Sequence, residues 1–386
     1  MKLIFWGKYL DTYLTDTLAR FESLTAGSIH YVLVEERFTR RGETGAQHGT
    51  HAGSQTILDK RGFQQQAKRI LEENGDALHL FLSFWGDKRL FAVLLRALAQ
   101  KIRVAVIFEP YTEIPVGYWK DEGWLGSVLK VLTRKVAYRA LWPLLQIAAR
   151  GELLCVLAVS PLAEDQLRRV GFPKQVIYPY AYFVEKKVVD ANSKNTEEGA
   201  LQVVFSGSLI KRKGLDVALA AVRQANRAKL TIRLDVYGAG VVDQQAIERT
   251  AGARYCGTYP QFEAQQVLSG YQLLLVPSRH EGWGLVVNEA LMQGVPVVAS
   301  DRVGAGCLIE SSGAGMIFKS EMVDDLVKVL EKLAKDSFEL VRITKACKEL
   351  DGKITPTAGA EYMMRVFEYH FSHLGERPIP GWLNLS

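Results

Sequence analysis

A pair of glutamates offers the clearest chemistry in this chain. Glu281 lies in the glycine-broken loop 277–284 (PSRHEGWG), and Glu289 lies on the helix expected to begin near Gly284 or Leu285. Helical geometry places Glu289 about one turn past the helix start, roughly 6–8 Å along the axis. The first amides and the dipole of that helix attract negative charge. The pattern suits a ligand whose hydroxyl groups flank a diphosphate, although isolated glutamates are more often solvated or ion-paired.

A basic loop precedes a second helix. Residues 207–214 (GSLIKRKG) carry three basic side chains, ending in Arg212 and Lys213, before a helical pattern from Leu215. Amides at a helix start, with a lysine or arginine, form an anion site suited to phosphate. The alternative is a solvated basic turn, and the residue order is not that of a P-loop. A second glycine turn, 238–240, is weak evidence for a nucleotide, because a tight strand-to-helix turn explains it better.

Short apolar segments alternate with helical ones, which is typical of parallel β-α-β units. We expect strands in the first half at 2–6, 29–34, 77–84, 104–108 and 153–159. In the second half we expect strands at 201–206, 230–237, 273–276 and 295–299, and a helix at 286–293. Ligands bind beyond the carboxyl ends of such strands. The loops should therefore converge on one crevice; they are residues 207–214, 238–240, 255–261 and 277–285.

Length and composition predict two globular domains. The chain has 386 residues, of which 48% are hydrophobic and 23% charged, which excludes disorder and low complexity. The polar stretch 184–200 is the expected linker between an N-terminal domain, residues 1–183, and a C-terminal domain, residues 201–360. We expect the C-terminal helix, within 361–386, to return to the first domain.

Several classes of protein are not expected. The four cysteines lie far apart, which argues against a zinc cluster or a disulfide framework and fits a reducing cytoplasm. No apolar run approaches the ~18–20 residues of a spanning helix, so we expect a soluble or peripheral protein. The net charge of +6 comes without a polybasic run, and no nucleic-acid partner is expected.

The segment SRHEGWGLVVNEALMQGVPVVASD resembles the signature of the retaining glycosyltransferases of family 4. FSGSLIKRKGLD resembles the same family's phosphate loop, and the match spans roughly residues 201–318. The resemblance implies an α/β protein with the GT-B fold, in which two Rossmann-like domains with parallel sheets face a central cleft. It also implies a retaining, metal-independent transfer of sugar from a UDP-, GDP- or ADP-linked donor to a hydroxyl of a glycan or lipid-linked acceptor. Bacterial cell-surface polysaccharide or lipopolysaccharide synthesis is the implied setting.

The resemblance carries roles onto individual residues. Glu281 would hold the donor sugar, Glu289 the ribose, and the amides around Gly284 and Leu285 the sugar and diphosphate. Lys213 would neutralise the departing diphosphate, and Arg212 would replace an arginine that relatives have where this chain has Ser208. Residues 255–259 would cradle the base, mostly through backbone atoms. The further donor-side candidates are Gly207, Gly238, Thr258, Tyr259, Gly282 and Trp283. Neither a cofactor nor a metal is expected, since no D-x-D motif with suitable flanks is present.

In the first domain the chain departs from the family pattern. Relatives with an H-E-P-like segment place histidine near the reacting sugar, whereas Phe108 precedes Glu109 here. We expect Glu109, a third catalytic candidate beside Glu281 and Lys213, and Tyr111 to face the cleft. Gly7 is what remains of the family's glycine pair after the first strand and is assigned to the acceptor side.

Two segments bear on the acceptor. Residues 117–150 interleave six basic side chains with apolar positions at helical spacing, which fits either a core-facing helix or one lying on an anionic membrane. Membrane contact would place the protein at the inner face of the cytoplasmic membrane. The polar stretch 40–55 is either a flexible loop, the plainer interpretation, or a mobile acceptor loop.

Other functions stay open at this point. A phosphorylase or a nucleotide-sugar epimerase shares the expected fold. A non-catalytic partner subunit that binds sugar nucleotides is a further alternative, because Phe108 and Ser208 replace residues that relatives use.

Overall fold

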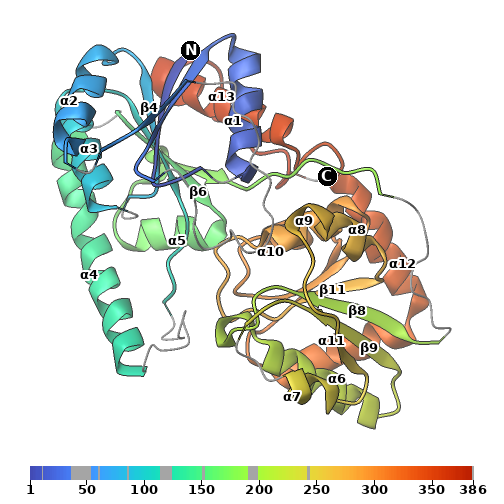
Figure 1. Cartoon of the computed structure of the whole chain (residues 1–386). Helices are drawn as coiled ribbons and strands as arrows, with labels where there is room; N and C mark the ends of the chain where they lie inside the picture. Colours follow the sequence, from blue (N-terminus) through green and yellow to red (C-terminus); the bar gives the residue numbers. More distant parts are fainter. Residues whose placement is uncertain are drawn as a thin grey trace. The chain divides into compact units, whose positions relative to one another are not determined.

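The computed structural model divides into two compact units, each described by itself (Figure 1). The first comprises Met1–Tyr111, Thr133–Phe183 and Thr355–Pro380, and the second Thr112–Leu132, Val184–Ile354 and Gly381–Ser386. The structure describes residues 1–10, 12–35, 54–59, 61–84, 87–113, 124–149, 153–189, 199–240 and 244–384.

The first unit is built on a parallel sheet with strand order β3-β2-β1-β4-β5-β6-β7. Its strands are β1 (Lys2–Gly7), β2 (Ser28–Leu33), β3 (Ser54–Ile57), β4 (Leu78–Leu82), β5 (Val104–Phe108), β6 (Leu154–Val159) and β7 (Ile177–Tyr180). Every residue of β5 and β6 is buried, because helices cover both faces of the sheet. These helices are α1 (Thr12–Thr25), α2 (Phe63–Glu73), α3 (Lys88–Ala99), α5 (Pro161–Arg169), α13 (Pro356–Ser372) and, from Thr133 onward, α4 (Trp124–Ala149).

The C-terminal helix α13 belongs to the first unit. It packs against α1, where the rings of Phe21 and Phe367 meet edge to face with centroids 5.9 Å apart. The other face of the sheet is covered by α2, α3, α4 and α5, which contribute to one core. In α2 the buried residues Phe63, Ala67 and Leu71 recur every four residues, the spacing of a helix with one apolar face.

The second unit is built on a parallel sheet with strand order β10-β9-β8-β11-β12-β13. Its strands are β8 (Leu201–Ser206), β9 (Ile232–Tyr237), β10 (Ala253–Tyr255), β11 (Leu273–Val276), β12 (Val297–Ser300) and β13 (Gly315–Phe318). The helices are α6 (Leu215–Arg227), α7 (Gln244–Glu248), α8 (Ala264–Ser269), α9 (Leu285–Met292), α10 (Gly306–Ser312), α11 (Val323–Lys335) and α12 (Ser337–Ala346). α6 and α11 pack together over one face, while α8, α9 and α10 cover the other (Figure 1).

The strands expected from the sequence form in both sheets, with ends that shift by a few residues. Four further strands were not predicted, namely β3, β7, β10 and β13. β3 overlaps the stretch 40–55, which was expected to be a loop: Ser54 and Gln55 instead pair with β2, and residues 40–53 lie outside the described part. The expected linker 184–200 has no helix or strand over its described residues, 184–189 and 199–200.

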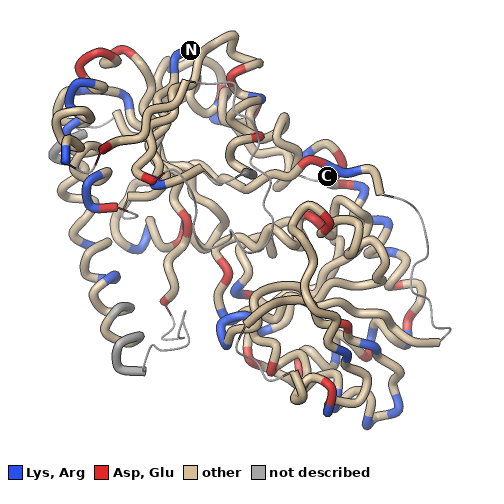
Figure 2. Tube along the Cα trace, in the orientation of Figure 1, with Lys and Arg blue, Asp and Glu red and all other residues tan. Residues whose placement is uncertain are grey.

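Helix α4 has one buried side and one exposed side. Tyr138, Leu141 and Leu145 enter the core of the first unit. Leu129, Leu132, Val136 and Leu144 are each at least half exposed. Figure 2 shows Lys and Arg along the same helix. Lys135 and Arg139 of this helix are exposed. The core-facing interpretation of 117–150 therefore holds for one side of α4, whereas 117–123 lies outside the described residues.

Candidate active site

The basic loop and the glutamate loop of the second unit meet. The turn Lys211–Lys213 follows β8 and precedes α6, and Glu281 follows β11. Lys213 Nζ donates a hydrogen bond to Glu281 Oε2, and Arg212 Nη1 donates to the same oxygen at 3.2 Å. Arg212 also donates to the carbonyl of His280 at 2.6 Å. Two cations and one carboxylate, each with a side chain about 15% exposed, thus share one site.

Glu281 is held rigidly and stays ionised. Its amide donates to Arg302 O at 2.9 Å, and its carbonyl accepts from Gly304 N at 3.0 Å. Burial alone would raise the pKa of Glu281, but the charges of Lys213 and Arg212 outweigh burial and hold that pKa below its usual range. The site therefore carries a net positive charge, which suits an anionic ligand.

Gly214 lets the two loops approach each other. It has a φ of +71° and directly precedes α6, and a Cβ there would lie 2.0 Å from Pro277 O. A side chain cannot fit at that distance, and the left-handed conformation is itself costly for other residues. Glycine at 214 is thus what allows the turn to lie against the end of β11.

The start of α9 supplies amides beside Glu281. Gly284 caps this helix with a φ of +98°, a conformation that favours glycine, and Leu285 is its first residue. The first amides of an α-helix have no carbonyl partner within the helix, and they carry the positive end of its dipole. On the same helix Glu289 is 5% exposed, and its Oε1 accepts from Gln261 Nε2 at 3.2 Å.

Residues 282 and 283 follow Glu281 in the loop, and the Trp283 side chain is buried. The Trp283 side chain is 3% exposed, and its Nε1 donates to Asn288 Oδ1 at 2.7 Å. Its carbonyl accepts from Ala305 N at 2.8 Å, which anchors the loop beneath Gly282. The indole of Trp283, one of the donor-side candidates, thus lies in the interior of the unit, where its N–H has a buried partner.

The loops after β8, β9 and β10 are joined by hydrogen bonds. Gly207 N donates to Tyr237 O at 3.1 Å, and Gly238 N donates to Gly257 O at 2.8 Å. The Tyr255 hydroxyl donates a hydrogen bond to Gly238 O at 3.0 Å. These bonds bring the expected phosphate loop and the expected base loop to the same edge of the sheet.

Tyr259 and Thr258 lie at that edge in different environments. The Tyr259 hydroxyl shares a short hydrogen bond with Ser206 Oγ, and its ring stands edge to face with Tyr237 at 5.2 Å. Burial raises the pKa of Tyr259 to about 12, so the phenol stays neutral. Thr258 is exposed.

The candidates of the first unit follow β1 and β5. Gly7 ends β1, and its carbonyl accepts from Val34 N at 3.2 Å. Glu109 is exposed and accepts a hydrogen bond from the Tyr182 hydroxyl. Tyr111 stacks on Tyr138 with ring centroids 4.5 Å apart.

Phe108 and Gln166 show how the end of β5 is fixed. Phe108 is 1% exposed and packs with Phe84, so this position, at which the resemblance leads one to expect histidine, holds a core residue. The Gln166 amide accepts from Tyr111 N at 3.0 Å and donates to Tyr111 O at 2.7 Å. This anchors the main chain just past Glu109.

The described residues were searched for a metal site and for a membrane-spanning helix. Within them, no group of three or more His, Cys, Asp or Glu is placed to hold a metal ion. Asp324 and Asp325 lie in the first turn of α11. In the same part of the chain, none of the helices is both long and apolar enough to cross a membrane.

Sequence reasoning missed two polar residues of this region. Arg279 lies between Pro277 and Glu281 in the loop, but its partners are distant in the sequence: Asp216 is sixty-three residues away. Gln261, the partner of Glu289, lies twenty-eight residues before it. Nothing in the spacing of these residues indicates that they meet.

Comparison with known proteins finds a family match within the second unit. Residues 188–350 match the glycosyl transferases group 1. The amylovoran biosynthesis glycosyltransferase AmsK of Erwinia amylovora is 24% identical over 215 residues, covering 53% of this chain and 52% of AmsK. The sulfoquinovosyl transferase SQD2 of Arabidopsis thaliana is 26% identical over 259 residues, covering 66% of this chain and 49% of SQD2. The chain thus spans about half the length of these curated relatives.

The fold extends over nearly the whole chain. The crystal structure of Anabaena HepE in complex with UDP superposes with a TM-score of 0.68 and 13% identity, covering 97% of this chain and all of HepE. At that identity the likeness concerns the fold alone. The two parallel sheets of this chain confirm the predicted α/β fold with a parallel sheet in each domain. The chain has the GT-B fold, and its residues 188–350 match the model of the glycosyl transferases group 1.

Proposed function

We propose that the protein is a retaining, metal-independent glycosyltransferase. It would move a sugar from a nucleoside diphosphate sugar to a hydroxyl of a glycan or lipid-linked acceptor. The family of residues 188–350 and the names of the relatives support sugar transfer as the reaction class. AmsK is named for amylovoran biosynthesis, which supports a role in bacterial cell-surface polysaccharide synthesis.

One observation carries this proposal: Lys213 and Arg212 converge on Glu281 beside the N-terminus of α9. When the bond between the sugar and the diphosphate breaks, negative charge grows on the phosphate oxygens. Preorganised cations and helix amides stabilise that charge, and such electrostatic stabilisation is often the largest single contribution to catalysis. The cluster supplies this stabilisation from protein groups, which is why we propose a mechanism that needs no metal ion.

The proposed chemistry needs no covalent enzyme intermediate. The acceptor hydroxyl would attack the sugar carbon on the face that the diphosphate leaves, and its proton would pass to the departing phosphate oxygen. Glu281 is paired with two cations and would hold sugar hydroxyls rather than act as a nucleophile. Retaining glycosidases, in contrast, use two carboxyl groups on either side of the bond.

Membrane contact through 117–150 is part of the proposal. The exposed side of α4 combines four large apolar side chains with basic ones, and such a surface suits an anionic bilayer. A lipid-linked acceptor would then be met at the inner face of the cytoplasmic membrane. The acceptor side would include Gly7, Glu109 and Tyr111.

Donor turnover tests the proposal. The purified chain is incubated with UDP-, GDP- and ADP-hexoses in EDTA, and release of the nucleoside diphosphate is followed with and without polyprenyl-phosphate-linked glycans. We expect release from one nucleotide class, with UDP first in line because HepE was solved with it. Lys213→Met should abolish release, whereas Arg342→Gln, on the distant helix α12, should not. No release from any donor, or release that depends on a divalent ion, would overturn the proposal.

A further inference from the structure

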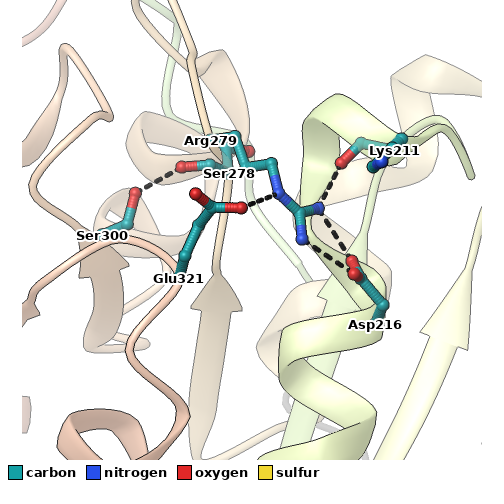
Figure 3. Close-up of polar contacts among 6 residues, drawn as sticks. All are labelled: Lys211, Asp216, Ser278, Arg279, Ser300 and Glu321. Atoms are coloured by element: carbon teal, nitrogen blue, oxygen red, sulfur yellow. Dashed lines mark hydrogen bonds and ion pairs between the residues drawn. The ribbon is translucent and has the colours of Figure 1, made fainter. Parts of the chain in front are cut away.

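A buried arginine, Arg279, forms hydrogen bonds with several groups next to the candidate active site. Arg279 is 7% exposed, and its guanidinium donates to both carboxylate oxygens of Asp216, at 2.8 and 2.7 Å (Figure 3). Its Nε donates to Glu321 at 2.7 Å, and Nη1 donates to the carbonyl of Lys211 at 2.6 Å. These hydrogen bonds outweigh burial and raise the pKa of Arg279, so its charge is permanent. Four of its five N–H groups have protein acceptors in this arrangement.

The same residue holds the turn Lys211–Lys213 from the main chain. The amide of Arg279 donates to the carbonyl of Arg212 at 2.8 Å. Two successive carbonyls of the turn therefore accept hydrogen bonds from one residue. In return, Arg212 binds the carbonyl of His280, and both Arg212 and Lys213 bind the Glu281 side chain. The main chain of one loop and the side chains of the other are thus bonded reciprocally.

We infer that Arg279 is a positioning residue for the diphosphate of the donor. It fixes the carbonyls of the cationic turn and so sets where Arg212 and Lys213 present their charges. This inference rests on the proposed function, since it specifies how the diphosphate end of that site is built. In this inference Arg279 does not itself bind the ligand, because its guanidinium is occupied by Asp216, Glu321 and the turn.

The chemistry of the site requires arginine rather than lysine. Asp216 is bound by two parallel N–H donors, a planar fork that a single ammonium group cannot reproduce. The guanidinium also reaches Glu321 and the Lys211 carbonyl, so it joins α6, the turn and the start of α11 at one point (Figure 3). A lysine would keep the positive charge but could not make most of these hydrogen bonds at the same time.

Ligand affinity separates a positioning role from a purely structural one. Dissociation constants are measured by calorimetry for the nucleoside diphosphate that wild type binds best, and by ligand-observed NMR for its nucleoside. The variants are Arg279→Lys, Arg279→Gln and Asp216→Asn, each compared at a temperature where circular dichroism shows it folded. Arg342→Gln is the matched control, since Arg342 also pairs bidentately with a carboxylate, Glu339, but on α12.

We expect Arg279→Lys and Arg279→Gln to weaken diphosphate binding at least about tenfold, the usual scale for a displaced charged hydrogen bond. Binding of the nucleoside should stay within about twofold of wild type, because the turn faces the phosphates. The diphosphate affinity of Asp216→Asn should lie between that of wild type and that of the two Arg279 variants. The affinity of Arg342→Gln should equal that of wild type.

The results for wild type test the proposed function, and the results for the variants test the positioning role of Arg279. If wild type binds no nucleoside diphosphate, the proposed function fails, and this inference fails with it. If wild type binds one and both Arg279 variants bind it equally well, the inference alone is wrong. An equal loss for nucleoside and diphosphate would also overturn it, because the whole site would then have been disturbed. If Arg279→Gln does not fold, Arg279→Lys and Asp216→Asn decide the question.

Discussion

Lys213 and Glu281 form an ion pair between two loops that are sixty-eight residues apart in the sequence. The pair joins the turn after β8 to the loop after β11, strands that are neighbours in the sheet. Neighbouring parallel strands bring their carboxyl ends to one edge, which is where ligands of such sheets bind. With Arg212 on the same carboxylate, the positive charge exceeds the negative one. A diphosphate would therefore meet a site already shaped to receive it.

Removing the charge of Glu281 should separate donor binding from catalysis. Glu281→Gln leaves Arg212 and Lys213 without a competing carboxylate. Affinity for the nucleoside diphosphate should be unchanged or higher, as calorimetry would show. Sugar transfer should fall roughly tenfold to hundredfold, because a charged hydrogen bond to the sugar is lost. Weaker diphosphate binding together with normal turnover would contradict this role.

Alanine at position 214 should destabilise the protein through a clash. Gly294 provides the control, because its φ of +70° nearly equals the +71° of Gly214 while nothing lies within 4 Å of its Cβ position. Gly294→Ala should lower the free energy of unfolding by only about 1 kcal/mol, the cost of placing alanine in the left-handed backbone conformation. Gly214→Ala should cost at least about 2 kcal/mol more, because its Cβ meets Pro277 O. Urea denaturation measures both, and equal costs would show that the loops move apart freely.

His79 should make stability depend on pH. Trp6 Nε1 donates to His79 Nδ1 at 2.9 Å, and His79 Nε2 lies 3.0 Å from Asn74 O, an arrangement that requires a neutral imidazole. Burial lowers the pKa of His79 to about 4, against about 6.5 in the unfolded chain. The unfolded state binds more protons between these values. The free energy of unfolding should therefore fall by about 3 kcal/mol as pH decreases from about 6.5 to 4.

His79→Gln isolates this contribution from the other titrating groups. Glutamine offers Trp6 an acceptor but does not titrate. The stability difference between wild type and variant, from urea denaturation, should shrink as the pH falls through this window. A difference that stays constant would mean that His79 does not carry the pH dependence.

The exposed apolar side of α4 should bind anionic membranes. Replacing Leu132 and Val136 with asparagine should reduce flotation with phosphatidylglycerol-rich vesicles by roughly tenfold or more, since each loses buried apolar surface. Phe338→Asn on α12, which removes an apolar side chain that is 87% exposed, is the control and should have no effect. Flotation that is unchanged in the double variant would place any membrane contact elsewhere.

The strands that the sequence predicted are the central ones. β5, β8 and β11 were predicted to the residue, because strands buried on both faces read as continuous apolar runs. The four missed strands, β3, β7, β10 and β13, all lie at sheet edges. Edge strands need less apolar sequence: β3 is SQTI, largely exposed, and β10 is ARY. Their pairing is decided by the neighbouring strand rather than by their own pattern.

The site could be predicted in part for a similar reason. Glu281, Lys213 and the start of α9 carry local signals, namely glycines, charges and a strand-to-helix turn. The role of Arg279 depends on Asp216 and Glu321, which only the fold brings together. The burial of the Trp283 indole likewise depends on Asn288, a contact that the motif does not reveal.

Nucleoside diphosphate binding by the metal-free protein tests the central claim most directly. Melting temperatures of wild type and Lys213→Met are measured in EDTA with UDP, GDP, ADP and NAD⁺. We expect one nucleoside diphosphate to stabilise wild type, by about 2.7 kcal/mol at a hundredfold excess over Kd, and to stabilise Lys213→Met much less. Three results would contradict a diphosphate site built on Lys213 and Glu281. Only NAD⁺ raises the melting temperature, none of the four compounds raises it, or a nucleoside diphosphate raises it equally in wild type and Lys213→Met.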